Sequence, residues 1–361
     1  MENNHDAKMV LSEILRSILQ SGINAGIPGV SAAIATSKGI MWQDSAGFAV
    51  LEKNIPIDDS TVFGIGSITK VFVAVVILQL IEESQLNLSD RISEHLDQAR
   101  LDGIGNANDA TIGSLPSHTA GIKSWEDDLN WITEARGKKL DSKAIWGKKD
   151  TLNYVRRPSR LETGHFSYSN TNYTLLGLIV ERITGHSAES EIRRTILDSL
   201  NLMNTFLEGF EEVESRKENV PHRYHFATDI FHKTAGVCPS FSEHKWNDVD
   251  LVNANGKLLS PSSMDLLKTR QPATESTKIG HGIFRSGNSR TQENWLGHNG
   301  SVLGFTGSLW WNDEIDCVVC VLANVGTMHA GKVSSSAPQI AFESGFLEAA
   351  VKPTDIAVKD E

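Results

Sequence analysis

The sequence predicts an α/β fold in which one antiparallel sheet is built from both ends of the chain and flanked by helices, with a mainly helical lobe inserted between them. Two observations predict this arrangement. Strand-like runs with short turns lie near both ends, at residues 29–50 and 305–324, and helical or loop patterns fill residues 67–207. If strands from the two ends share one sheet, the middle of the chain has to form its own layer.

The same pattern predicts the domain organisation. Residues 1–66 and 251–361 form the expected α/β sheet region, and residues 67–250 form the mainly helical lobe and its loops, all within a single unit. At 361 residues, of which 40% are hydrophobic, the chain is long enough for one large core or for two lobes that share a cleft. We expect the functional site in that cleft.

Apolar residues near the beginning of the chain recur at helical spacing. They are Val10, Leu11, Ile14, Leu15, Ile18 and Leu19. Because polar residues interrupt them and the preceding segment has mixed charge, the pattern predicts an amphipathic helix of the folded protein rather than a signal peptide. The longest apolar run elsewhere, residues 71–81, is shorter than the roughly 20 residues that span a bilayer. We therefore expect a cytoplasmic protein without a membrane segment.

The strand-like runs predict two β-hairpins. Residues 29–35 and 40–50 flank a Thr-Ser-Lys-Gly turn, and residues 305–311 and 315–324 flank Asn-Asp-Glu. Short apolar runs that are bounded by such turn residues are typical of antiparallel strand pairs. A helical stretch is expected to follow, from about residue 337 to residue 350.

Charge argues against two classes of partner. The formal net charge is −11 at pH 7, and the lysines and arginines are scattered along the chain rather than clustered. Such a protein repels a nucleic-acid backbone and an anionic bilayer alike. We therefore expect no nucleic acid and no membrane as a partner, which leaves a small molecule as the expected ligand.

Cysteines and histidines predict no metal or redox site. The cysteines are Cys238, Cys317 and Cys320. Three are too few for a disulfide framework and fit a reducing compartment. Cys317 and Cys320 lie in an apolar run, so we interpret them as strand residues rather than a redox or metal-binding pair. His222 and His225 lie in the polar segment 208–250, which predicts loops with short elements and offers no third ligand at a matching interval. We expect no cofactor.

A serine and a lysine three residues apart begin the helical lobe. Ser67 and Lys70 lead directly into the apolar run 71–80. At the first turn of a buried helix they share one face, which places a hydroxyl nucleophile beside an amine base. The unpaired N–H groups and the positive dipole of a helix start also favour the anionic oxygen that forms during acyl transfer. A second match, Ser242 with Lys245, has no buried helix behind it and is discarded.

Two further polar segments complete the candidate site. Residues 164–177 form a loop with Tyr168 and Asn170 that leads into an apolar helix. A tyrosine followed two residues later by an asparagine can supply a proton shuttle and an amide for the substrate. The third segment, residues 297–301, precedes the last hairpin, and its small residues let a substrate approach a sheet edge. Its candidate substrate-binding residues are His298, Gly300 and Ser301.

The order S-x-x-K, Y-x-N and H-x-G resembles the class C β-lactamase and penicillin-binding-protein superfamily of serine hydrolases, whose relatives include esterases, D-aminopeptidases and transesterases. Three more segments are similar to family patterns, at residues 111–122, 200–205 and 254–266. The likeness therefore runs from about residue 26 to residue 326, and it implies a β-lactamase-like fold.

The resemblance also implies a role for each matching residue. Ser67 would be the acylated nucleophile, with Lys70 and Tyr168 as the proton-transfer pair. Asn170 would contact a substrate amide, and the backbone N–H groups of Ser67 and Ser301 would form the oxyanion hole. Either a neutral lysine takes the serine proton, or a charged lysine holds the tyrosine as a phenolate that takes it.

Several residues depart from the family pattern or stay open in role. His298 stands where β-lactamases and cell-wall transpeptidases have a lysine, and a neutral imidazole attracts a substrate carboxylate less than an ammonium does. The substrate therefore need not be a β-lactam acid. Pro116 and Asn255 are further departures. Trp125 either packs in the core or lines the acyl pocket. His118, in an H-T-A-G turn, is expected to tie down the turn backbone.

These features together predict a serine hydrolase or acyltransferase for a small-molecule ester, lactone or amide, in a metabolic or biosynthetic step. The acyl group would pass from Ser67 to water, or to an acceptor alcohol or amine. Two alternatives are β-lactamase or D-amino-acid peptidase activity, and a catalytically inactive binding protein that keeps the fold. The intact motif residues argue against the inactive protein, because drift would be expected to remove at least one of them.

Overall fold

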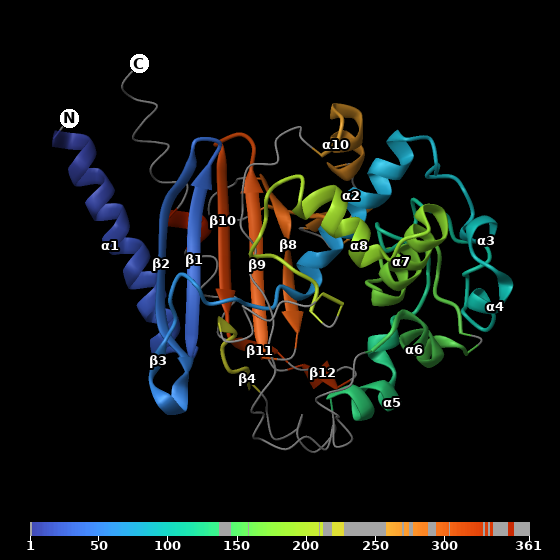
Figure 1. Ribbon diagram of the computed structural model, residues 1–361, viewed down its shortest axis with the longest axis horizontal. Helices are drawn as coiled ribbons and strands as arrows, with labels where there is room; N and C mark the ends of the chain where they lie inside the picture. The colour runs from blue at the N-terminus through green and yellow to red at the C-terminus, as the bar shows by residue number, and fades with distance from the viewer. Residues whose placement is uncertain are drawn as a thin grey trace.

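A central sheet separates two groups of helices in the computed structural model (Figure 1). Helix α1 (Glu2–Asn24) lies beside the strands of the N-terminal hairpin, and the helices of the middle segment gather on the other side of the molecule. The structure describes residues 2–136, 146–157, 159–208, 210–211, 219–226, 258–268, 271–273, 277–287, 294–302, 304–327, 329–330, 333–334 and 346–349.

The sheet confirms that both ends of the chain build one antiparallel layer. Its nine strands follow the order β3-β2-β1-β10-β9-β8-β7-β6-β5, and neighbouring strands pair antiparallel throughout. Between β1 and β10, the third and fourth strands of this order, Ala32 pairs with Val321, which joins the first hairpin to the last. The strands are β1 (Gly29–Thr36), β2 (Gly39–Val50), β3 (Ile55–Pro56), β5 (Gln271–Pro272), β6 (Thr277–Ile279), β7 (Phe284–Gly287), β8 (Asn294–Val302), β9 (Phe305–Asn312) and β10 (Cys317–Ala323).

Two short strand pairs lie outside this sheet. Strand β4 (Tyr224–Phe226) pairs parallel with β11 (Val325–Thr327), and β12 (His329–Ala330) pairs with β13 (Val333–Ser334). The polar segment predicted to hold loops with short elements therefore contributes a strand at its described part. Cys238, the second S-x-x-K match, Asn255 and most of the helix predicted near residues 337–350 lie outside the described residues, although 346–349 are helical.

Helix α1 packs on one face of the sheet through only part of its predicted apolar stripe. Leu15 and Leu19 are buried in a cluster with Val30 and Val321, because alternate residues of β1 and β10 point to that face. Val10 and Ile14 are instead exposed, at 56% and 39%. The helical period was predicted correctly, but the buried stripe is narrower than the predicted one, because Ile14 is exposed although its neighbour Leu15 is fully buried.

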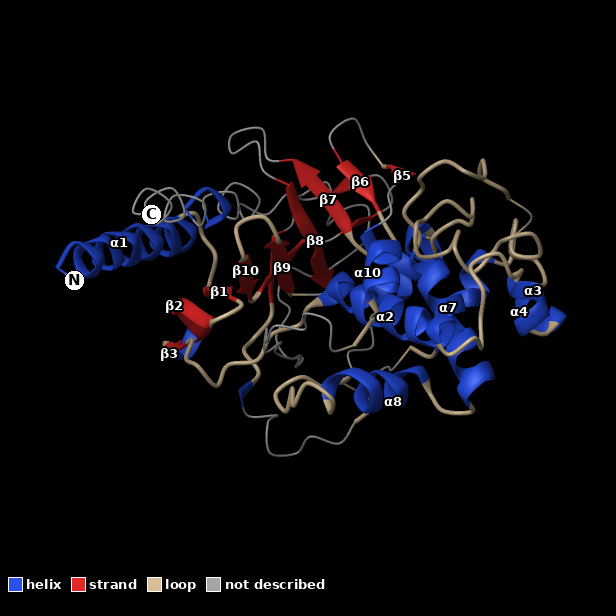
Figure 2. Cartoon of the chain, turned by 90° about the horizontal axis from the view of Figure 1, so that it is seen from above, coloured by secondary structure: helices blue, strands red, loops and turns tan. Residues whose placement is uncertain are grey.

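The helices of the middle segment form a second core beside the part of the sheet that holds β5 to β8 (Figure 2). They are α2 (Thr69–Glu82), α3 (Ile92–His95), α4 (Gln98–Leu101), α5 (Leu129–Trp131), α6 (Lys148–Leu152), α7 (Asn170–Thr184) and α8 (Ala188–Ile192), joined by α10 (Pro261–Lys268). Short 3₁₀ turns occur at Leu51–Lys53, Gly66–Ile68, Trp125–Asp127 and Asn153–Val155, and π-helical turns at Ile132–Arg136 and Arg193–Leu197.

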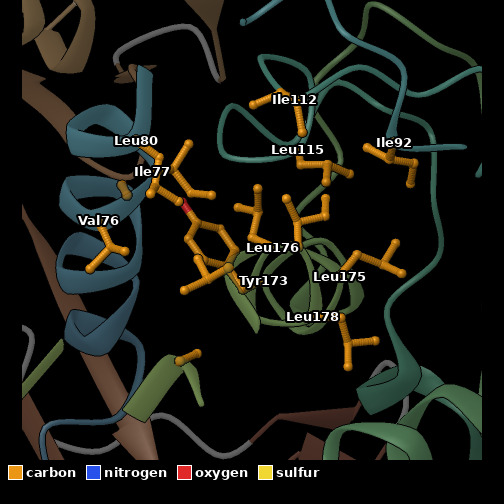
Figure 3. Packing of buried hydrophobic residues seen from close by; sticks show 14 of the residues in the cluster. Val76, Ile77, Leu80, Ile92, Ile112, Leu115, Tyr173, Leu175, Leu176 and Leu178 are labelled. Carbon is orange, nitrogen blue, oxygen red and sulfur yellow. The ribbon is translucent and has the colours of Figure 1, made fainter. Parts of the chain in front are cut away.

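Helices α2 and α7 meet across the centre of this second core. Ile77 and Leu80 of α2 face Tyr173 and Leu176 of α7 (Figure 3). Both helices begin at candidate site segments, so this packing fixes the two segments relative to each other. None of the helices that the structure describes is long and apolar enough to cross a membrane.

Candidate active site

Ser67 lies in a 3₁₀ turn, Gly66–Ile68, that runs straight into α2. The sequence predicts Ser67 at the first turn of an α-helix, whereas the structure has it in the tighter 3₁₀ turn just before the helix. Residues three apart eclipse each other in a 3₁₀ turn. Lys70 thus points back along the chain, and its Nζ donates to the Ser67 Oγ over 3.0 Å. Lys70 is buried, whereas Ser67 is partly exposed.

Tyr168 brings a phenol to the same serine from the polar loop before α7. Its hydroxyl oxygen lies 2.8 Å from the Ser67 Oγ. The aromatic ring of Tyr168 also faces the lysine, with the Lys70 Nζ 5.1 Å from the ring centroid. The structure therefore brings an alcohol, an amine and a phenol within proton-transfer distance, from chain segments that are a hundred residues apart in the sequence.

Two glycines let the Ser67 turn touch strand β8. Gly66 has a φ of +52°, and a Cβ added there would lie 2.7 Å from the backbone nitrogen of Ser301. A Cβ added to Gly300 would lie 1.7 Å from the carbonyl oxygen of Ile65 and 3.1 Å from the backbone nitrogen of Ser67. A side chain at either position would push the two backbones apart. The close approach gathers the N–H groups of Ser67 and Ser301 in one region.

The surroundings of Lys70 are aromatic. Besides Tyr168, the Tyr173 ring centroid lies 5.4 Å from the Lys70 Nζ, and burial raises the pKa of the Tyr173 phenol well above its usual value, so it stays protonated. Two buried imidazoles, His118 and His298, complete the surroundings. Burial, together with the positive charge of Lys70, lowers the pKa of both. At neutral pH the lysine is therefore surrounded by uncharged rings.

His298 forms part of the wall behind Tyr168. Its side chain is only 3% exposed, and its ring centroid lies 5.0 Å from Phe284 and 6.4 Å from Tyr168. The Nδ1 lies 2.5 Å from the carbonyl oxygen of Asn299, which can only accept, so the proton is on Nδ1. Burial first, and then the Lys70 charge, lowers the pKa of His298 to about 3. Direct contact with a substrate stays a prediction for this residue.

The buried imidazole predicts a pH-dependent stability. The pKa of His298 is about 3 in the folded chain against 6.5 ordinarily. As the pH falls from 6.5 towards 3, the unfolded chain therefore takes up a proton at this group and the folded chain does not. The folded state has its full stability above pH 6.5 and loses stability as the pH falls through this window. In this window one such histidine lowers the free energy of unfolding by about 1.4 kcal/mol for each pH unit by which the pH falls. Urea unfolding of His298→Asn should show a slope smaller by about that amount.

Replacing the exposed His165 by asparagine is the matched control for that measurement, because its side chain is 72% exposed. A smaller slope in His298→Asn than in His165→Asn would assign the effect to the buried imidazole. Equal slopes for wild type and His298→Asn would show that the buried imidazole does not titrate in this way.

Asn170 has a partner that the sequence motifs do not predict. Its Nδ2 donates to the Glu126 carboxylate, and its backbone nitrogen donates to the Ser124 Oγ over 3.1 Å. The Thr171 Oγ1 adds a bond to the carbonyl oxygen of Lys123, over 2.7 Å. These bonds fix residues 123–126 on the first turn of α7. Because a carboxylate only accepts, the amide nitrogen of Asn170 faces Glu126 and its Oδ1 faces away.

Trp125 is half-buried in this same segment. Its Nε1 donates to the Thr174 Oγ1 over 3.1 Å, and its ring meets Trp131 edge to face at 4.7 Å between centroids. These contacts place Trp125 against α7, next to Glu126. Core packing accounts for them, and a role in an acyl pocket stays a prediction.

No group of three or more His, Cys, Asp and Glu side chains could hold a metal ion in the part of the chain that the structure describes. His222 lies 3.4 Å from the carboxylate of Glu52. Cys317 and Cys320 are both buried on β10, where they face opposite sides of the sheet, in separate hydrophobic clusters. Their places agree with the interpretation of the two cysteines as strand residues.

Comparisons with known proteins identify the family and the fold of the chain. The model of the family described as Beta-lactamase matches residues 13–334. Protein flp of Staphylococcus aureus (strain N315) is 26% identical over 347 residues, which cover 91% of this chain and 65% of that protein. The chain thus spans less than two thirds of the length of this relative.

Solved structures show the same fold. The D-amino acid amidase from Ochrobactrum anthropi SV3, complexed with L-phenylalanine, superimposes with a TM-score of 0.76 at 19% identity, covering 95% of this chain and 99% of that one. The D-stereospecific amidohydrolase from Streptomyces sp. gives a TM-score of 0.72 at 19% identity, covering 87% and 94%. The penicillin-binding protein homologue from Pyrococcus abyssi, an octamer, gives 0.68 at 23% identity, covering 86% and 73%. At these identities the likeness concerns the fold.

Proposed function

Because the chain belongs to the Beta-lactamase family, we propose that it is a serine hydrolase or acyltransferase that forms an acyl-enzyme at Ser67 from an ester or amide. One observation supports this proposal above the others. Ser67 is partly exposed, and its Oγ lies 3.0 Å from the Lys70 Nζ and 2.8 Å from the Tyr168 hydroxyl oxygen. A serine that contacts an amine and a phenol has two routes for its proton when it attacks a carbonyl.

In the proposed reaction the Ser67 Oγ bonds to the acyl carbon while its proton passes to Tyr168 or Lys70. The negative charge that develops on the carbonyl oxygen would be stabilised by the backbone N–H groups of Ser67 and Ser301, which Gly66 and Gly300 allow to approach. The same proton then passes to the leaving alcohol or amine. Water, or an acceptor alcohol or amine, would release the acyl group by the reverse sequence of proton transfers.

The electrostatics of the site argue against a β-lactam acid as the preferred substrate. His298 stands at the position of the family lysine, and burial keeps its pKa at about 3, so it has no charge to offer a carboxylate at neutral pH. Esters, lactones and amides without a carboxylate would bind no more weakly with histidine in place of the lysine. We therefore place small-molecule acyl donors of this kind ahead of cephalosporins and penicillins.

A more specific substrate class is favoured by Asn170 and Glu126. Ser169 is extended, with φ −147° and ψ 117°, and its side chain is fully buried. Neighbouring side chains of an extended backbone alternate in direction, so Tyr168 and Asn170 share the opposite side. Asn170 thus offers its Oδ1, an acceptor, beside a carboxylate. Both suit an acyl donor with an amino group, and the amidases of matching fold act, by their names, on D-amino acid amides or D-stereospecifically.

A panel of matched acyl donors tests both parts of the substrate proposal. Alanine 4-nitroanilide, propanoyl 4-nitroanilide, 4-nitrophenyl propanoate and a chromogenic cephalosporin differ in amino group, scissile bond and carboxylate. We expect the propanoate to be turned over faster than the cephalosporin. We also expect kcat/KM for alanine 4-nitroanilide to exceed that for propanoyl 4-nitroanilide about tenfold or more, as charged hydrogen bonds add about 1.5–3 kcal/mol.

The variant Glu126→Gln sharpens this comparison, since it keeps the shape of the side chain and removes its charge. The ratio of the two nitroanilide rates should fall towards one in this variant. Faster hydrolysis of the cephalosporin than of the propanoate would contradict the argument from His298. Equal rates for the two nitroanilides in the wild-type protein would contradict the argument from Asn170 and Glu126.

A further inference from the structure

The H-T-A-G turn at residues 118–121 holds the loop in which Tyr168 lies. Backbone bonds join the two segments at three places. They are Leu161 N to Gly121 O at 3.1 Å, Gly164 N to Thr119 O at 2.8 Å and Ser167 N to His118 O at 2.8 Å. The Nδ2 of Asn106 strengthens the far end by donating to the carbonyl oxygens of Gly121 and Leu161. The turn therefore acts on another segment and not only on its own backbone.

The His118 side chain continues this series of contacts to the residues on both sides of Tyr168. Its Nδ1 accepts from the backbone nitrogen of Ser169 over 3.0 Å, so His118 binds residue 167 with its carbonyl oxygen and residue 169 with its ring. Between these bonds the imidazole lies on the Tyr168 ring, with 4.4 Å between centroids and 31° between planes. Because the residues before and after Tyr168 are hydrogen-bonded and one face of its ring is packed, the phenol has little freedom to move.

The backbone and the charge of His118 fit this task. The residue has a φ of +56°, a conformation that non-glycine residues adopt uncommonly and that histidine, asparagine and aspartate tolerate best. Because Nδ1 accepts from Ser169, the proton of the neutral ring is on Nε2, which has no hydrogen-bond partner. Burial, and then the charges of Lys70 and His298, lower the pKa of His118 well below its usual value. A charged ring would turn an N–H towards the Ser169 N–H.

We propose that His118 is a positioning residue for the Tyr168 phenol, which it holds at the Ser67 Oγ through the Ser169 hydrogen bond and the ring contact. The inference rests on the proposed function, because it assigns His118 to the proton-transfer geometry of the same site. Misplacing a reacting group by about 1 Å can cost about a hundredfold in rate. The role is thus large enough to measure apart from folding stability.

Asparagine and leucine are the replacements for His118, and because leucine is the more strained of the two at a φ of +56°, the stability of each variant is measured beside its rate. They have nearly the same shape, but the Oδ1 of asparagine can take the place of Nδ1 as acceptor for the Ser169 N–H, while leucine offers no acceptor. We expect His118→Leu to lower kcat for an aryl ester about a hundredfold with KM changed less than about threefold. His118→Asn should recover about tenfold of that loss. If the leucine variant does not fold, His118→Gln replaces it, because its longer side chain places the acceptor elsewhere.

A double-mutant cycle with Tyr168→Phe separates positioning from general damage. If His118 acts through the phenol, the two His118 variants should differ by less than about threefold in the Tyr168→Phe background. The same factor in both backgrounds, or equal rates for the asparagine and leucine variants of the otherwise wild-type chain, would overturn the inference. Labelling of Ser67 by a fluorophosphonate, followed by mass spectrometry, distinguishes the two failures. If Ser67 of the wild-type protein is not labelled, the proposed function itself is wrong. If Ser67 is labelled normally in every variant, only the proposed role of His118 is wrong.

Discussion

Replacing Ser67 by alanine is expected to abolish turnover, by at least about 10³-fold, while the protein stays folded. The substitution removes the only atom within hydrogen-bond distance of both the Lys70 Nζ and the Tyr168 hydroxyl in the described site. Without it no acyl-enzyme can form, and the binding groups that remain supply only a small part of the rate. Ser67 is partly exposed and its side chain is small, so the thermal midpoint should change little. Hydrolysis of an aryl ester and a melting curve measure the two effects.

The chain contains its own control for this experiment. Ser242 and Lys245 repeat the S-x-x-K spacing in a segment of the sequence that holds none of the proposed site residues, so Ser242→Ala should keep full activity. Intact-mass analysis after incubation with an acyl donor should show one adduct in the wild-type protein and none in Ser67→Ala. Near-normal turnover in Ser67→Ala would contradict the proposed mechanism. The absence of any adduct in the wild-type protein would favour a catalytically inactive binding protein that keeps the fold.

Tyr168→Phe is expected to lower kcat by roughly two orders of magnitude or more. Phenylalanine keeps the ring, and with it the contacts to His118 at 4.4 Å and to the Lys70 Nζ at 5.1 Å. Only the hydroxyl, 2.8 Å from the Ser67 Oγ, is lost. A positioned acid or base contributes about 10²–10⁴-fold in rate, so the loss should appear in kcat with little change in KM. Single-turnover acylation by an aryl ester is the direct measurement.

Tyr173→Phe is the matched control for that loss. Its hydroxyl donates to the carbonyl oxygen of Pro116 over 3.1 Å and has no bond to Ser67, although its ring lies 5.4 Å from the same lysine. The variant should keep activity within about threefold, and it should lose no more than about 1 kcal/mol of stability, because the Pro116 carbonyl oxygen still accepts from the backbone nitrogen of Gly282. If both phenylalanine variants lose activity equally, the phenol of Tyr168 has no special part in proton transfer.

The fold could be predicted from the sequence because the deciding patterns are local. Two hairpins with short turns near opposite ends, and long apolar runs such as 71–80 between them, are sufficient to indicate a shared antiparallel sheet and a separate helical core. The details that differ depend on tertiary contacts. Val10 and Ile14 are exposed because they lie outside the helix face that buries Leu15 and Leu19, and the start of α2 tightens into a 3₁₀ turn where it meets β8.

The candidate site could be predicted as a set of segments but not as a set of contacts. The motifs indicate Ser67, Lys70 and Tyr168, and the structure brings these side chains together, while their catalytic roles stay predictions. Glu126 has no motif of its own. Its contact with Asn170 follows from hydrogen bonds between α7 and residues 123–126, which periodicity does not reveal. The burial of His298 likewise depends on two rings from distant segments, Phe284 of β7 and Tyr168 of the loop before α7.

The pairing of β1 with β10 also has a consequence for synthesis on the ribosome. Val30 can pair with Ala323 only after nearly three hundred more residues have been added, so the two parts of the sheet join late. Contacts between such distant segments slow folding, and until they form the nascent β1 presents an unsatisfied edge to other chains. Strand β8 must also be synthesised before the Ser67 turn can contact Ser301. The growing polypeptide therefore has no complete acylation centre during most of its translation.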